Sequence, residues 1–151
     1  MQALKGLVSL LGRVLLSAIF LMSAAANHIP RFNEDAGMLA GKIQGLIKDA
    51  PPWLPQVAMG GAIAFMILGG VSVLVGFKAR IGALLLFLFL AAATYFFHDF
   101  WNAGGEAYAN QMIHFMKNAA IAGGMLFVVA NGGGAWSLDA CFKGAPAGAT
   151  V

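Results

Sequence analysis

The fold is decided by residues 54–97, which read LPQVAMGGAIAFMILGGVSVLVGFKARIGALLLFLFLAAATYFF. In this stretch two long apolar runs meet at the turn Lys78-Ala79-Arg80, which is cationic and contains no acid. A membrane-spanning helix needs about 20 mainly apolar residues, and each run is close to that length. The stretch therefore predicts two transmembrane helices, which are antiparallel because the link between them is short.

Two more apolar runs flank this pair, so that spans are expected at residues 4–28, 54–77, 81–98 and 109–130. Of the 151 residues, 60% are hydrophobic and only 10% are charged, whereas a soluble domain carries about 25% charged residues. This composition excludes a soluble or disordered chain, and the single cysteine excludes a disulfide scaffold. We expect an all-α membrane protein, one domain over residues 1–151, with four transmembrane helices in an up-down-up-down bundle.

The longest connection, residues 29–53, is predicted to contain a short helix. Glu34 and Asp35 are acids of the kind favoured at a helix start, and Pro51-Pro52 would end the helix. At 100° per residue the apolar side chains of this segment gather on one half of the helix. They are Met38, Leu39, Ile43, Leu46 and Ile47. The pattern indicates a short helix between the first and second spans that lies on the outer membrane surface or caps the bundle.

The orientation of the spans is predicted from Lys and Arg residues near the helix ends, because these residues favour the cytoplasmic side. The segments that would face outward carry Glu34, Asp35, Asp49, Asp99 and Glu106. Five cations would lie inside and four outside, so the acid-free turn Lys78-Ala79-Arg80 is the sharper signal. The inner cations are Lys5, Arg13, Lys78, Arg80 and Lys143, and the outer ones are Arg31, Lys42, Lys48 and Lys117. We predict a multi-pass protein of the bacterial inner membrane with both termini in the cytoplasm, where the lone Cys141 would stay reduced.

Two features of the spans concern packing. The glycine pairs Gly60-Gly61, Gly69-Gly70 and Gly123-Gly124 are expected to let helices approach each other closely. Arg13 lies in the first span, and we expect it to be paired near the inner surface with Asp139 or with backbone carbonyls.

The candidate site comes from the few polar side chains in the spans, where an ionised side chain costs about 2.5–3.5 kcal/mol at mid-depth. In the fourth span, Asn110, Gln111, His114, Lys117 and Asn118 fall within an arc of about 120°. The three histidines lie near the outer ends of three different spans. We therefore predict one pocket at this end, formed by His28, Tyr95, His98, His114, Lys117 and Asn118.

Several ligands suit such a pocket. It could hydrogen-bond the carbonyls of a quinone that enters from the lipid, ligate a metal through neutral imidazoles, or hold a haem between two histidines. Metal and haem are less favoured, because no two histidines are spaced i, i+4 and no Cys or carboxylate joins them at ligand spacing. No catalytic residue or metal ligand is assigned. Two alternatives remain open: the polar stripe of the fourth span faces another subunit, or Lys117 extends its amine to the membrane surface.

The motifs, taken in order, resemble the DoxX family of small four-helix membrane proteins. The resemblance is carried by 12–21, Leu68-Gly69-Gly70, 75–80, 97–101, 111–124 and Ser137-Leu138-Asp139. It implies membrane redox chemistry with soluble or anchored partners, since the family takes its name from a subunit of thiosulfate:quinone oxidoreductase. Many members carry a Glu in the second helix, where this chain has the apolar residues 63–67, so Lys117 lacks that carboxylate partner.

Two functions follow as expectations. The first is a quinone-linked redox or electron-transfer accessory subunit of a membrane complex; an accessory role is expected because the sequence shows no motif for a flavin, a metal or a thiol pair. The alternative is a non-catalytic membrane anchor or assembly subunit. Whether the chain is itself an enzyme is left open. The expected partners are the lipid bilayer and either other protein subunits or further copies of the chain; nucleic acid is not among them, since nine cations on so apolar a chain form no basic stripe.

Overall fold

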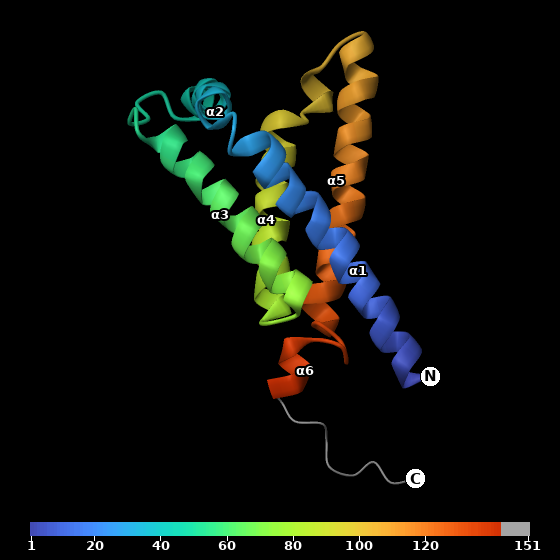
Figure 1. Ribbon diagram of the computed structural model, residues 1–151. Helices are drawn as coiled ribbons and strands as arrows, with labels where there is room; N and C mark the ends of the chain where they lie inside the picture. The colour runs from blue at the N-terminus through green and yellow to red at the C-terminus, as the bar shows by residue number, and fades with distance from the viewer. Residues whose placement is uncertain (143–151) are drawn as a thin grey trace.

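The computed structural model describes residues 1–142 and shows helices joined by short links (Figure 1). The helices are α1 (Gln2–Ser23), continued by the π-helical turn η1 (Ala24–His28), α2 (Phe32–Leu46), α3 (Leu54–Val75), α4 (Ala79–Phe97), the 3-10 turn η2 (Phe100–Asn102), α5 (Glu106–Asn131) and α6 (Leu138–Phe142). Four helices are long and apolar enough to cross a membrane: Gln2–His28, Leu54–Val75, Ala79–Asn102 and Glu106–Asn131. The prediction of an all-α chain with four such helices is confirmed. Residues 143–151, with Lys143, lie outside the described part of the chain.

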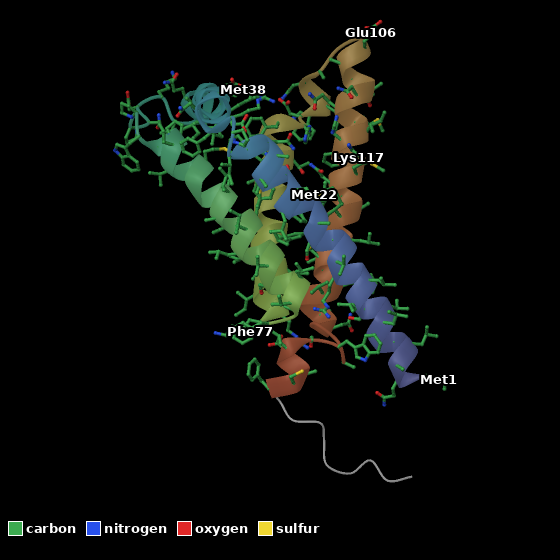
Figure 2. The ribbon with its side chains drawn as sticks, in the orientation of Figure 1. Met1, Met22, Met38, Phe77, Glu106 and Lys117 are labelled. Carbon is green, nitrogen blue, oxygen red and sulfur yellow. The ribbon has the colours of Figure 1, made fainter. Side chains whose placement is uncertain are left out.

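Some of the predictions concern the membrane itself or the chain as a whole. A helix does form at Phe32–Leu46, with Ala36, Leu39 and Ile43 on its buried side. That this helix lies on a membrane surface, that the spans alternate across a bilayer, and that residues 1–151 form one domain all stay predictions. The end of the molecule that carries Met1 and Phe77 is called the inner end here, and the end that carries Met38 and Glu106 the outer end (Figure 2).

The helices pack in the order α1, α3, α4, α5 around a thin core. α3 packs along α4, α4 packs along α5, and α1 crosses α3. α1 meets α5 where Leu16 faces Gly124, and the two helices diverge from there toward the outer end (Figure 1). Phe20, Met66, Leu86 and Met125, one from each of the four long helices, are buried in this core. The divergence of α1 from α5 decides which parts of the predicted site can meet.

Glycine sets the closest helix contact. A Cβ on Gly69 of α3 would lie 2.8 Å from the carbonyl oxygen of Gly82 and 2.8 Å from Leu86 Cγ, both on α4. A Cβ on Gly70 would lie 2.8 Å from Leu21 of α1. Gly69, Gly70 and Gly124 therefore are close-packing sites, as predicted, but Gly60, Gly61 and Gly123 meet no atom within 4 Å, so the prediction is wrong for these three.

Two charged side chains of opposite sign, Arg13 and Asp139, hydrogen-bond the backbone on either side of the α3–α4 turn at the inner end. Buried Arg13, which is 2% exposed, donates from Nη1 to the carbonyls of Val73 (3.2 Å) and Leu74 (2.9 Å), and from Nη2 to that of Trp136. The carbonyls in the last turn of a helix lack partners within it, so Arg13 satisfies the C-terminus of α3. Asp139 accepts from the backbone N–H groups of Lys78 (2.8 Å) and Ala79 (3.2 Å) at the start of α4.

This arrangement answers what Arg13 is paired with. Of the two expected kinds of partner, backbone carbonyls accept its hydrogen bonds, while Asp139 serves α4 instead. Gly76 makes the approach possible, because its φ of 71° is left-handed and a Cβ there would overlap both Arg13 and Ser137. The segments that suggested the DoxX resemblance at 12–21, 75–80 and 137–139 thus meet in one structural joint.

Candidate functional site

The outer halves of α4 and α5 are joined by polar contacts. The rings of His98, at the end of α4, and His114, on α5, are stacked with centroids 4.8 Å apart and planes 8° from parallel. His98 Nδ1 lies 3.0 Å from Gln111 Oε1. Further along the same contact, Asn118 Nδ2 donates to Thr94 Oγ1 at 2.9 Å. We call these five residues the α4–α5 polar ladder.

A cavity of about 270 Å³ lies beside the ladder between α4 and α5. Its lining includes Ala91, Thr94, Tyr95, Trp101, Phe115 and Asn118. The wall is almost entirely apolar, and the Thr94–Asn118 pair and the Tyr95 phenol are its polar groups. Trp101 packs edge to face on Phe115 with centroids 6.2 Å apart, and both aromatic rings line the cavity. We call this space the α4–α5 cavity.

The six residues predicted to form one pocket are divided by the structure into separate places. Tyr95 and Asn118 line the α4–α5 cavity, and His98 and His114 stack further out along the ladder. His28 lies elsewhere, with Nδ1 2.7 Å from Oδ2 of the nearly buried Asp35 on α2. The reason is the divergence of α1 from α5, which removes His28 from the other histidines (Figure 1).

Lys117 stands apart from all of these groups. It lies on α5 with an exposed side chain (Figure 2) and has no ion pair or hydrogen bond to any side chain within residues 1–142. By helical angle it sits about 120° from Gln111, toward the side on which Gly124 meets Leu16 of α1. The side of α5 that carries Lys117 is therefore exposed, because α1 diverges from α5 there.

The two stacked histidines are not arranged to share a metal ion. The nitrogen lone pairs of an imidazole lie in the plane of its ring, so two parallel stacked rings do not direct them at a common ion. Within residues 1–142 no three His, Cys, Asp or Glu side chains are grouped so that they could hold a metal ion. The stacked pair does not fit two axial ligands of one haem iron.

Two features at this end of the molecule, a pair of aromatic residues and an ion pair, were not predicted from the sequence. Trp101 and Phe115 enclose the cavity, but an aromatic residue near the end of a span is typical of any membrane helix. Lys42 and Asp99 lie 57 residues apart and form an ion pair with Nζ 3.5 Å from Oδ2. No local spacing in the sequence signals a pairing that depends on how α2 packs on α3 beside the end of α4.

Together these features define the class of protein: an all-α, multi-pass membrane protein with a polar interhelical contact and an adjoining apolar cavity near one end. The DoxX family model matches residues 8–99, more than half of the chain, and the SURF4 family model matches residues 58–144. The chain belongs to the DoxX family.

A curated relative agrees with this assignment. The chain is 30% identical over 99 residues to the inner membrane protein YphA of Escherichia coli (strain K12), an alignment that covers 66% of this chain and 70% of that protein. No solved structure matches. Together with the four apolar helices, the relative supports a multi-pass protein of a bacterial inner membrane.

Proposed function

We propose that this DoxX-family protein is an accessory subunit of a membrane redox complex and that it binds the headgroup of a quinone in the α4–α5 cavity. The observation that carries the proposal is the cavity itself, which has an apolar aromatic wall and a few polar groups. Ligand pockets commonly combine these features, with the apolar wall giving affinity and the polar groups giving orientation. A bound quinone would supply two-electron, two-proton redox chemistry.

The side chains of the cavity fit a flat dicarbonyl ring. Asn118 uses one amide hydrogen on Thr94, and the Thr94 hydroxyl donates to the Leu90 carbonyl at 2.6 Å, which fixes the orientation of the amide. An amide NH₂ has two hydrogens, so Asn118 keeps one to donate to a ligand carbonyl. The phenol of Tyr95 is a further donor, and the ring of Trp101 can pack on a planar ligand.

Replacing Asn118 with leucine is expected to weaken quinone binding about tenfold, the loss of one well-placed hydrogen bond of about 1.4 kcal/mol. The full chain, purified in mild detergent, would be titrated with a short-tail ubiquinone. Ala91→Phe, which adds a ring to the cavity and keeps both Asn118 and Thr94, should block binding. Asn110→Leu on the exposed surface of α5 is the matched control. Unchanged affinity in Asn118→Leu, or an equal loss in Asn110→Leu, would contradict the proposal.

A second candidate, the non-catalytic assembly subunit, is favoured by the outer half of α5. The buried residues of this helix are Met125 and Val128, so none lies between Glu106 and Gly124, although this half carries the polar stripe. A charged Lys117 in lipid is costly, and a partner subunit on this face would remove that cost. The same preparation discriminates the two functions: an assembly subunit should show no saturable quinone binding, and Lys117→Ala with His114→Ala should release a co-purifying subunit.

We also propose that the inner end faces the cytoplasm. Met1 and Phe77 lie at that end (Figure 2), and Lys78 and Arg80 form a turn with no acid between them. Cys141 is exposed at the same end in α6. An impermeant thiol reagent is expected to label Cys141 only in inverted vesicles or after the membrane is opened. Labelling in intact spheroplasts would reverse the orientation.

A further inference from the structure

A second pocket, of about 250 Å³, lies at the outer end between α2 and the end of α4. The residues that matter in its lining are Lys42, Tyr95, Phe96, Asp99, Trp101 and Asn102. It shares Tyr95 and Trp101 with the α4–α5 cavity, so these two rings form a wall between the spaces. We call it the outer pocket, and neither the predicted quinone site nor the polar ladder includes its charged groups.

The charges of the outer pocket are opposite and only loosely paired. Lys42 Nζ lies 3.5 Å from Asp99 Oδ2, longer than a normal charged hydrogen bond, and the two side chains are 45% and 27% exposed. Asp99 is held in place by Asn102, whose Nδ2 donates to Oδ2 at 3.2 Å. A loose, exposed ion pair contributes little to stability, so both charges remain able to interact with a ligand.

Aromatic rings stand next to the acidic side of the pocket. Tyr95 packs on Phe96 with centroids 5.3 Å apart and on Trp101 with centroids 6.5 Å apart. The faces of such rings attract ammonium groups, and the nearby Asp99 carboxylate adds to that attraction. This side of the pocket therefore suits a cation, whereas Lys42 suits an anion a few ångströms away.

The position of the pocket fits the depth of a lipid headgroup. It lies where α4 ends and where α2 folds over the bundle, and α2 exposes Met38 and Leu46. Exposed apolar side chains on an amphipathic helix, with aromatic residues beside it, are typical of the zone between water and acyl chains.

We propose that the outer pocket binds the headgroup of a zwitterionic phospholipid. Its phosphate contacts Lys42, and its ammonium group lies between Asp99 and the rings of Tyr95 and Trp101. The site is separate from the proposed quinone site, since the polar groups of that cavity, Thr94 and Asn118, do not line the outer pocket.

The test uses the purified full chain in mild detergent, titrated with short-chain phosphatidylethanolamine and followed by native mass spectrometry. Saturable binding is expected, with short-chain phosphatidylglycerol, which is anionic and has no ammonium group, binding at least about tenfold more weakly. Lys42→Gln and Asp99→Asn should each weaken phosphatidylethanolamine binding about tenfold. Lys48→Gln and Asp49→Asn, which make the same charge changes at exposed loop positions, should not.

A charge exchange separates lipid binding from a purely structural ion pair. Lys42→Asp combined with Asp99→Lys keeps two opposite charges together but puts the cation against the aromatic rings. The melting temperature is expected to stay unchanged while lipid binding is lost. Equal binding of the two lipids, no saturable binding of either, or retained binding after the exchange would overturn the proposal.

Discussion

Arg13→Met is expected to lower the free energy of unfolding by about 3–5 kcal/mol, because three backbone carbonyls lose a charged donor and a buried carbonyl left without a partner costs about 1–3 kcal/mol. Arg13 supplies three carbonyls with hydrogen bonds, from α3 and from the segment that leads to α6. Methionine fills similar space but donates nothing, so the last turn of α3 and Trp136 lose their donor. In detergent the melting temperature should fall by about 10 °C.

Two variants show whether the stability that Arg13 provides depends on the several donors of its guanidinium or only on its positive charge. Arg13→Lys keeps the charge but cannot reach three carbonyls at once, so it should recover less than half of the loss. Arg31→Ala removes a cation outside the spans, where a hydrogen bond at 3.0 Å to Glu34 raises the pKa of Arg31. Because that pair is exposed, the melting temperature should not change. A stable Arg13→Met protein would show that the inner joint does not depend on this residue.

Gly69→Val is expected to destabilise the protein by about 3 kcal/mol or more, because α3 and α4 cannot keep their separation around a branched side chain. The first added carbon would already lie 2.8 Å from the Gly82 carbonyl oxygen, which belongs to backbone and cannot rotate away. Gly69→Ala should lose about 1–3 kcal/mol by the same contact. Thermal unfolding in detergent measures both changes.

Gly61→Ala is the matched control for Gly69→Ala. Gly61 is in the same helix and a Cβ there meets nothing within 4 Å, so Gly61→Ala should stabilise α3 by about 0.5–1 kcal/mol through the lower flexibility of the unfolded chain. If Gly61→Ala and Gly69→Ala change the melting temperature alike, the α3–α4 approach is not set by glycine.

The contrast between Gly69 and Gly61 shows the limit of what the sequence predicts. Four long apolar runs predict four helices, because the length needed to cross a membrane is a local property of the chain. Which glycine of a helix meets a neighbour depends on the rotation of that helix in the bundle. Both positions belong to Gly-Gly pairs, and only the packed structure distinguishes them.

In the candidate site, too, some contacts follow from local spacing in the sequence and others depend on how the helices pack. Thr94 and His98 share a face of α4 by their i, i+4 spacing, and Asn118 and His114 share a face of α5, so their approach follows from two local periodicities. His28 was grouped with them only because it lies at the same end of its helix. Equal depth in a membrane does not make side chains neighbours, and the angle between α1 and α5 separates them.

The distance along the chain between Arg13 and its acceptors sets an order of events during synthesis. Leu74 follows Arg13 by 61 residues, and Trp136 follows it by 123. When α1 first enters the membrane none of these carbonyls has been made, so the guanidinium has to stay near water or lipid phosphate. Burial of Arg13 waits for α3 and then for the segment after α5. The first helix to be made is thus among the last to reach its final depth.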